Sequence, residues 1–367
     1  MAPVPCAPIR LSARTRSRIM SQYSMAASAP DVRLTQLSTG GVGDVADSLN
    51  LFRGDVNLPL PLVALRGRNG LDLAVTAFYG SNVEAATQPS NRTAPTGVLG
   101  VGWSLPREQV LRDPTTDDLY LVVGGSPRQL VRAASGAADE YELLDHQFWA
   151  IRRFPDEADP GRDRWEVVRE DGTVHTYGLT GVEWGVQWDN WRGSGTAPGG
   201  RQFPLAWNLV RVVTPQGDRL DFSYEREDVP IGGPAGAKYT RACYLTGISH
   251  TDGQRIDLRY REKEPFEVVP PHPTPPGGAQ AFQDRYESRY LDRIEVRTDA
   301  GPGLYSVRLD YEFLDVSRTD VRGDRSAYRK RYLSAVTEVA DTGAAAPPLT
   351  IRYDGDRTGA NPARSGR

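Results

Sequence analysis

The chain has 367 residues, of which 39% are hydrophobic and 25% charged, a composition typical of an ordinary globular protein. Because 44 Lys and Arg nearly balance 47 Asp and Glu, the net charge of −3 gives no indication of a nucleic-acid or anionic-membrane partner. Two cysteines and four histidines, none at metal-ligand spacing, argue against a disulfide framework and a zinc site, and no apolar run is long enough to span a membrane.

Residues 1–32 are predicted to form a disordered tail or an over-extended start. The first thirty residues contain arginines and no acidic residue, but they lack the continuous apolar segment of a secretory signal. Residues 356–367 are predicted to form a second disordered tail. Between the tails we expect an N-terminal β-rich domain over residues 33–200 and a β-hairpin array over residues 201–355.

Strand signals dominate the chain, whereas helical spacing is weak and 28 Pro and 37 Gly recur throughout. The stretch LDLAVTAFYG, residues 71–80, alternates with Leu71, Leu73, Val75 and Ala77 on one face. The fold is therefore predicted to be mostly β, a curved antiparallel sheet of stacked β-hairpins with few helices.

Next along the chain, GVLGVGWSLP (residues 97–106) combines Gly97, Gly100 and Gly102 with Trp103. A glycine inside a regular element costs about 0.5–1 kcal/mol relative to alanine, so such a cluster needs a geometric reason. The usual reasons are a bulge, a sharp bend or the close approach of another backbone.

Two further segments follow in the N-terminal half. In RWEVVREDGTVHTYG, Asp171 and Gly172 lie between two alternating runs, which is a strong hairpin signal with Gly172 in the turn. In EWGVQWDNWRG, Trp184, Trp188 and Trp191 either form an aromatic platform for a sugar or pack as a tryptophan-rich loop against the sheet, and we favour the packing interpretation.

A repeat occupies the second half. LVRVVTPQGDRLDFSY (209–224) aligns without gaps on LTGISHTDGQRIDLRY (245–260), and looser copies begin at Leu291 and Leu333. Each copy reads as a strand, a turn and a strand that ends in a tyrosine, namely Tyr224, Tyr260, Tyr311 and Tyr353. A single hairpin cannot bury its apolar face, but stacked hairpins can, so the copies are predicted to join edge to edge.

Several of these motifs together resemble a known family. They are Leu58-Pro59-Leu60-Pro61, Gly67-Arg68-Asn69-Gly70 with its following strand, Gly100-Val101-Gly102-Trp103-Ser104-Leu105, and Asp171-Gly172-Thr173 with Tyr177-Gly178. The combination resembles the N-terminal region of Salmonella virulence plasmid B-type proteins, of the B component of Tc insecticidal toxin complexes and of rearrangement-hotspot (YD-repeat) proteins. The resemblance covers about residues 33–355, and in it Asn69, Gly70, the three glycines, Trp103, Gly172 and the four repeat tyrosines are structural residues.

The resemblance implies a non-enzymatic β shell that encapsulates a toxic effector polypeptide. In such a shell we expect Gly100 and Gly102 to let the strand bend where the wall curves, with Trp103 filling the interior or the adjacent turn. The implied partners are the remainder of the shell, on the same or a separate chain, and the enclosed effector. The implied location is extracellular, as part of a secreted toxin system made in the cytoplasm. No catalytic residue, cofactor or metal is predicted.

Two alternatives are kept. The first is a carbohydrate-binding module of a bacterial surface protein, built on Trp184, Trp188 and Trp191, with a glycan as partner. The second is an ADP-ribosyltransferase, for which the sequence offers only short E-x-E patterns such as Glu140-Tyr141-Glu142 without the accompanying motifs.

Overall fold

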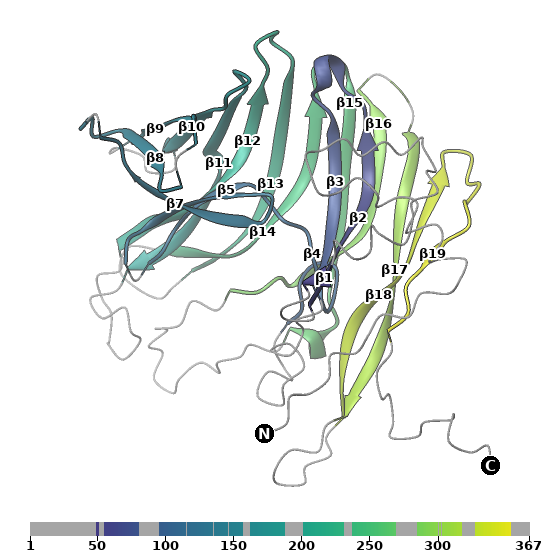
Figure 1. Cartoon of the computed structure of the whole chain (residues 1–367). Coiled ribbons are helices and arrows are strands. Elements are labelled where there is room, and N and C mark those ends of the chain that lie inside the picture. Colours follow the sequence, from purple (N-terminus) through teal and green to yellow (C-terminus); the bar gives the residue numbers. More distant parts are fainter. Residues whose placement is uncertain are drawn as a thin grey trace, which may run out of the picture.

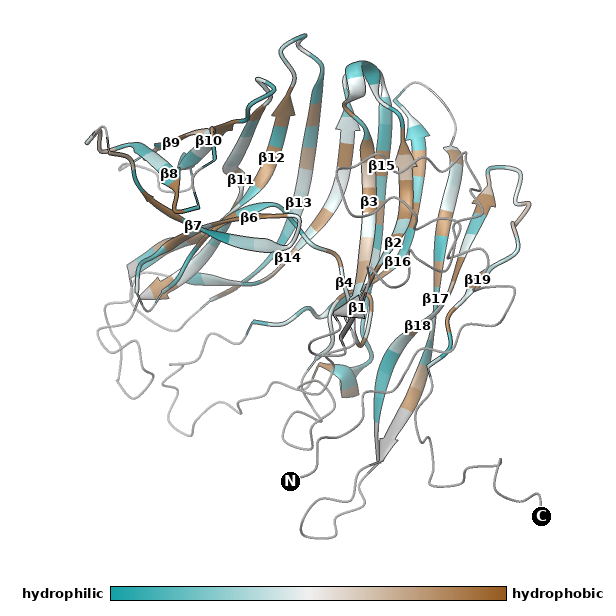
Figure 2. Ribbon diagram, in the orientation of Figure 1, coloured by the Kyte–Doolittle hydropathy of each residue, from teal (hydrophilic) through white to brown (hydrophobic). Residues whose placement is uncertain are grey.

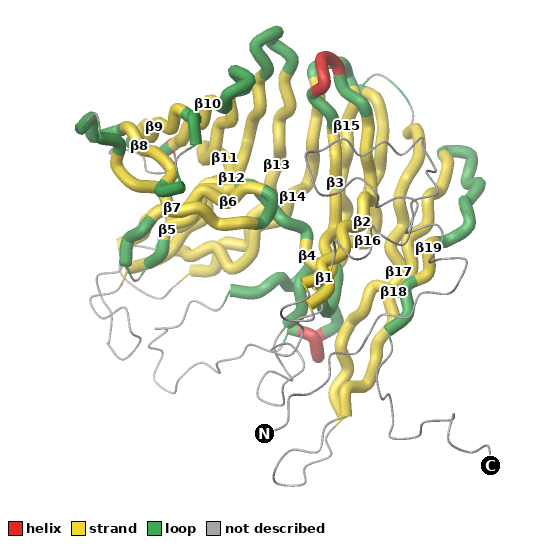
Figure 3. The backbone as a smooth tube through the Cα atoms, viewed as in Figure 1, coloured by secondary structure: helices red, strands yellow, loops and turns green. Residues whose placement is uncertain are grey.

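The computed structural model describes residues 49–50, 55–80, 95–156 except 115, 135 and 146, 162–187, 201–230, 237–268, 285–317 except 300 and 302, and 327–353. These residues are mostly β-strands, joined by turns and two short 3₁₀ turns, which confirms the predicted fold class (Figure 3). No described helix is long and apolar enough to cross a membrane. The two predicted tails, residues 1–32 and 356–367, lie outside the described residues, as does the junction of the N-terminal tail with the first domain.

The first sheet has the order β1-β2-β3-β4 and is antiparallel. Its strands are β1 (Leu49–Asn50), β2 (Asp55–Leu65), β3 (Leu73–Gly80) and β4 (Trp103–Ser104), with the 3₁₀ turn η1 (Arg68–Gly70) between β2 and β3. In β3 the predicted alternation is present, because Leu73, Val75 and Ala77 are buried and Leu71 is half-buried just before the strand. This hairpin therefore has one apolar face to pack against another layer.

The second sheet runs β11-β10-β9-β8-β7-β6-β5-β12-β13-β14-β15-β16-β17-β18-β19. Its strands are β5 (Gln109–Arg112), β6 (Leu119–Val123), β7 (Ser126–Arg132), β8 (Glu140–Leu143), β9 (Ala150–Phe154), β10 (Arg164–Val168), β11 (Val174–Gln187), β12 (Arg201–Val213), β13 (Arg219–Pro230), β14 (Lys238–His250), β15 (Gln254–Glu262), β16 (Arg289–Thr298), β17 (Gly303–Ser317), β18 (Ala327–Ala340) and β19 (Leu349–Thr350), and the 3₁₀ turn η4 (Pro265–Glu267) follows β15.

Strands β5 to β12 close into a barrel-like ring, because β12 pairs with β5 through Ala206–Asn208 and also with β11. The interior of the ring is filled by buried aromatic side chains: Trp165 packs edge-on against both Tyr141 and Trp207, with centroid distances of 4.8 and 5.7 Å. Arg153 lies over the rings of both tryptophans. Closure leaves these short strands without a free edge.

Strand β12 belongs to both parts of the sheet. Residues 206–208 pair with β5 of the ring, whereas residues 211–213 pair with β13 of the hairpin array. The predicted boundary between residues 200 and 201 thus falls just before a strand that pairs with both parts. The division into two domains stays a prediction.

The four predicted hairpins are β12–β13, β14–β15, β16–β17 and β18–β19, stacked side by side (Figure 1). Three of their turns contain a glycine with left-handed φ, namely Gly217 (φ 89°), Gly253 (φ 91°) and Gly343 (φ 84°). The amide of each glycine donates a hydrogen bond to the carbonyl of the residue three positions earlier. This is the geometry of a type I turn followed by a left-handed bulge residue, which glycine adopts without strain.

The main core lies between the two sheets. Figure 1 shows β2 and β3 lying across the array beside β15 and β16, and Figure 2 shows apolar and polar residues alternating along these strands. Buried residues of the hairpin, including Val63, Leu73 and Tyr79, belong to one hydrophobic cluster with Ile256, Ile294 and other residues of the array. The apolar face of the hairpin array is therefore covered by the chain's own N-terminal hairpin.

Candidate functional site

Each repeat tyrosine forms a hydrogen bond that closes its own repeat. The hydroxyl groups donate to the backbone carbonyls of the leucines that begin the copies: Tyr224 to Leu209 (2.7 Å), Tyr260 to Leu245 (2.9 Å), Tyr311 to Leu291 (2.5 Å) and Tyr353 to Leu333 (2.7 Å). We call these four contacts the tyrosine clasps. Burial raises the pKa of all four hydroxyls, so they remain protonated donors.

The same tyrosines also set the register between neighbouring repeats. Tyr224 pairs with Leu245, Tyr260 with Leu291 and Tyr311 with Leu333, in each case directly at a register shift. One residue of the following strand is skipped at each shift, as expected of a β-bulge, which bends and twists a strand. Each of these three tyrosines therefore fastens its own repeat and marks the place where the next repeat joins.

The glycine-rich segment forms a tight turn that contacts the array, and not a bend within a wall strand. The Gly100 amide donates to the Gly97 carbonyl (3.1 Å), and the Val101 amide donates to the Arg331 carbonyl of β18 (2.9 Å). Gly100 has a φ of 86°, and a Cβ atom placed there would lie 2.6 Å from the Arg331 carbonyl oxygen. The close approach of another backbone thus explains this glycine.

Trp103 connects the turn with the last clasp. Its side chain is buried, and its Nε1 donates to the Tyr353 hydroxyl at 2.8 Å. Its ring also packs against Tyr79 of β3, with centroids 5.2 Å apart. Gly102 has a φ of 79°, and its carbonyl accepts from the Gly80 amide at 2.8 Å. Trp103 therefore links the N-terminal hairpin to the array.

The tip of the β2–β3 hairpin is attached to two turns of the array. Asn69 (φ 55°) and Gly70 (φ 78°) form the left-handed tip, and Asn69 Nδ2 donates to Asp218 Oδ2 at 2.5 Å. The Gln254 side-chain Nε2 donates to the Arg66 carbonyl at 2.9 Å. Both contacts join residues more than 140 positions apart, so no local sequence pattern could have revealed them.

Gly172 lies in the turn between β10 and β11 with a φ of 80°, and its amide donates to the Arg169 carbonyl. Asp171 Oδ1 accepts from both the amide and the hydroxyl of Thr173, as in an Asx-turn. The predicted hairpin is therefore formed by the local chemistry that the sequence contains.

The residues of the candidate sugar platform are not brought together by any contact in the described part of the chain. Trp184 is half-buried and packs against the hydrophobic core. Its amide donates to Thr240 Oγ1, and its carbonyl accepts from Arg285. Trp188 and Trp191 lie outside the described residues.

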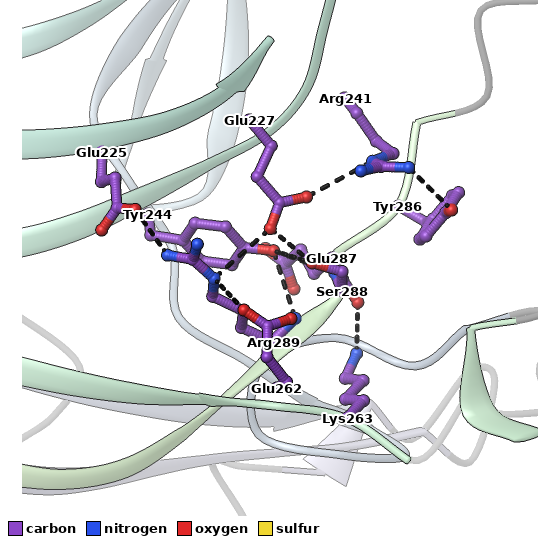
Figure 4. A network of polar contacts seen from close by, with 10 residues as sticks. All are labelled: Glu225, Glu227, Arg241, Tyr244, Glu262, Lys263, Tyr286, Glu287, Ser288 and Arg289. Atoms are coloured by element: carbon purple, nitrogen blue, oxygen red, sulfur yellow. Dashed lines mark hydrogen bonds and ion pairs between the residues drawn. The ribbon is translucent and has the colours of Figure 1, made fainter. Parts of the chain in front are cut away.

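A network of polar side chains, missed by the sequence analysis, holds the segment that enters β16 (Figure 4). Glu227 accepts from Ser288 and forms an ion pair with Arg241 at 3.3 Å. The Tyr244 hydroxyl accepts from the Ser288 amide (2.9 Å) and the Arg289 amide (3.2 Å). Arg289 also forms ion pairs with Glu225 (2.7 Å) and Glu262 (2.8 Å), so this one side chain bridges β13, β15 and β16.

At one end of this network a buried lysine joins the glycine-rich segment to the array. Lys263 Nζ donates to the carbonyls of Thr96 and Glu287, the latter at 2.6 Å. Glu287 Oε2 accepts from the Val98 amide at 2.6 Å. Burial lowers the pKa of Lys263 to about 8 and raises that of Glu287. Both side chains therefore act as anchors for the segment that contains Gly97.

A second cluster missed by the sequence analysis lies around Glu108, just before β5. Its carboxylate accepts from Arg169 (3.0 Å) and the Tyr177 hydroxyl (3.2 Å) and lies 3.5 Å from His175 Nδ1. Burial opposes ionisation of Glu108, but the contacts with His175 and Arg169 outweigh it and lower the pKa. The carboxylate is thus held by three neighbours on the ring.

The side chains at these sites hold chain segments in place. The Cys243 thiol is buried, which raises its pKa to about 12 and keeps it protonated, so it is a poor nucleophile. Within the described ranges no group of His, Cys, Asp and Glu could hold a metal ion. The tyrosines, Lys263 and Glu287 each have a backbone group as a hydrogen-bond partner, which suits positioning of chain segments.

No protein-family model and no curated protein matches the sequence. Solved structures with a similar fold include the crystal structure of TcdB2-TccC3, at 17% identity and a TM-score of 0.49, covering 80% of this chain and 16% of that chain. The N-terminal domain of effector protein SpvB from Salmonella typhimurium strain LT2 matches at 16% identity and a TM-score of 0.48, over 77% of this chain and 98% of that one.

The Photorhabdus luminescens Tc holotoxin pore with mutation TccC3-D651A matches at 15% identity and a TM-score of 0.45, over 80% of this chain and 15% of that one. This chain therefore spans about one sixth of the TcdB2-TccC3 chain and nearly the whole length of the SpvB domain. The sequence motifs resemble proteins of the same two kinds, toxin-complex and SpvB-type. The similarity to these structures is one of fold.

Proposed function

We propose that this chain is a non-enzymatic segment of a β shell in a bacterial toxin system, and that the shell encloses a toxic effector polypeptide. The observation that carries the proposal is the series of tyrosine clasps. Each clasp closes one hairpin, and the same tyrosine pairs with the leucine of the next hairpin. A wall built in this way grows by adding hairpins, and the bulge at each joint supports its curvature.

The surface of the wall is suited to enclosing another polypeptide without binding it tightly. The apolar face of the array is covered by β2 and β3, and the exposed large apolar side chains in the described part of the chain are scattered: Phe78, Leu144, Phe148, Leu179, Phe266 and Leu304. A contiguous apolar patch would bind an unfolded chain and trap it. Enclosure separates the effector from solvent and proteases.

The partners proposed are the remainder of the shell and the enclosed effector. In the described part of the chain, β19 is the last strand of the large sheet, and it pairs with β18 on one side only. A strand edge of this kind pairs readily with another strand, whether from the same chain or a separate one.

The test is the composition and protease resistance of the native assembly. An antibody against residues 201–355 is used to isolate the protein from its source under native conditions, and the isolate is treated with protease before and after mild denaturation. We expect a species larger than 40.4 kDa that contains a polypeptide protected until denaturation. A single 40.4 kDa species without a protected polypeptide would contradict the proposal.

Two controls separate the alternatives. Incubation of the purified chain with labelled NAD should transfer no label to protein, and transfer would identify an ADP-ribosyltransferase. A glycan array should show no binding, and binding that is lost in Trp184→Ala and Trp188→Ala variants would favour the carbohydrate-binding module.

A further inference from the structure

Five arginines stand in register on the polar face of β15, β16 and β17. Arg255 pairs with Arg297, Arg259 pairs with Arg293, and Arg293 pairs in turn with Arg308 on the next strand. The residues that alternate with them, such as Ile256 and Ile294, are buried in the core. The arginines therefore lie on the face opposite to the N-terminal hairpin, and we call this set the arginine face.

Arginine stands directly opposite arginine at three cross-strand positions of this face. Like charges directly opposite one another on neighbouring strands destabilise a sheet, and here three arginines follow one another across three strands. Each of the five side chains is between 40% and 55% exposed. The carboxylates of Asp257, Glu295 and Asp310 offset the repulsion between the arginines, while the guanidinium groups remain accessible to another molecule.

Every guanidinium group of the arginine face is oriented by a neighbouring carboxylate through its Nε atom. The contacts are Arg255 to Asp257 Oδ1 (2.9 Å), Arg297 to Asp257 Oδ2 (2.5 Å), Arg259 to Glu295 Oε2 (2.9 Å), Arg293 to Glu295 Oε1 (2.9 Å) and Arg308 to Asp310 Oδ1 (3.2 Å). Among the described residues the terminal nitrogens make one further ionic contact, from Arg259 to Asp257 at 3.8 Å.

Each guanidinium group is thus held in place while its two terminal nitrogens keep donors for another molecule. Paired terminal nitrogens match the two oxygens of a carboxylate in a bidentate contact, which lysine cannot form. The Asp257 side chain is only 4% exposed, so it lies beneath the arginines that it orients. The exposed face consequently presents more positive than negative charge.

We propose that the arginine face binds an acidic polypeptide segment that lies across β15, β16 and β17. Neighbouring strands are about 4.8 Å apart, so the row of Arg259, Arg293 and Arg308 spans about 10 Å, the length of about three extended residues. Glu295 and Asp310 stand between the arginines and would repel the dense charge of a sulfated glycan. A polypeptide can place its carboxylates over the arginines and neutral groups over these acids.

The experiment measures binding of a fluorescein-labelled peptide of five Glu-Ser repeats, in which a neutral residue follows each glutamate, to the full chain by fluorescence anisotropy. The test variant is Arg259→Gln, Arg293→Gln and Arg308→Gln together. The matched control removes the same charge from the ring, by Arg132→Gln, Arg152→Gln and Arg164→Gln, side chains that also form polar contacts there. Melting temperatures of all proteins are recorded so that a loss of binding is not mistaken for unfolding.

We expect the test variant to bind the peptide about tenfold more weakly, which corresponds to about 1.4 kcal/mol, and the control to bind within about twofold of the parent. A variant with three lysines at the same positions should also lose most of its affinity, because it keeps the charge but not the paired donors.

The proposal is overturned if the parent does not bind the peptide, if the control loses as much affinity as the test variant, or if the lysine variant binds like the parent. Heparin serves as the competing probe: binding of heparin without binding of the glutamate peptide would assign the face to sulfated glycans. None of these outcomes depends on whether the chain encloses an effector, so the inference can fail while the proposed function stands.

Discussion

Removing one tyrosine clasp should weaken the wall by a predictable amount. In Tyr260→Phe the ring remains in place and only the hydroxyl is lost, so the Leu245 carbonyl loses a donor at 2.9 Å. Because the side chain lies in the buried joint between two repeats, we expect the free energy of unfolding to fall by about 1–2 kcal/mol, the usual cost of a lost hydrogen bond with a buried partner. The melting temperature should fall by roughly 2–4 °C.

The matched control is Tyr305→Phe in β17. Tyr305 packs against the same hydrophobic core, and its hydroxyl makes no hydrogen bond with the described residues. The control should therefore change the unfolding free energy by less than about 0.5 kcal/mol. Both variants are compared by urea unfolding followed through tryptophan fluorescence, with the melting temperature as a second measurement.

Substituting all four clasp tyrosines tests whether the clasps act independently. The individual losses should add to about 4–8 kcal/mol, a large part of the total stability of a typical protein. Equal effects of Tyr260→Phe and Tyr305→Phe would refute the reasoning, since the hydroxyl would then contribute nothing beyond the ring. A loss of unfolding free energy at one clasp only would show that the four clasps do not contribute equally to stability.

Two further predictions concern the segment that joins the sheets. Gly100→Ala should destabilise the chain more than Gly217→Ala, because both glycines have left-handed φ, of 86° and 89°, but only a Cβ at position 100 meets another backbone, at the Arg331 carbonyl. Equal losses of about 1 kcal/mol in urea unfolding would show that strain alone matters. Lys263 has a pKa lowered to about 8 from 10.5, so the folded state releases its proton at a lower pH than the unfolded state, and its contribution to stability increases as the pH rises from about 8 to 10.5. The gain in unfolding free energy between pH 7.5 and pH 10 should therefore be smaller in Lys263→Met than in the parent, by about 1–2 kcal/mol. The exposed control Lys238→Met should show the same gain as the parent. An equal gain in all three proteins would contradict the lowered pKa of Lys263.

Local pattern was sufficient for the strands, the turns and the repeat. Alternating apolar residues determine which face of β3 is buried, and Asp171-Gly172 and Gly253 determine where the chain turns, because these preferences come from neighbouring residues only. The periodic spacing of Leu245 and Tyr260 likewise appeared in the sequence, since each repeat contains its own copy of both residues. The sequence by itself thus determined the class of fold and the unit that is repeated.

The partners of these residues were decided only by the tertiary structure. The hydroxyl of Tyr260 bonds to a carbonyl 15 residues away, and Gly100 meets the backbone of β18 more than 200 residues later in the chain. Lys263 is buried only because the glycine-rich segment is laid against the array, and the closure of the ring depends on β12 reaching back to β5. Such contacts depend on where distant strands meet in space, which the pattern of neighbouring residues does not encode.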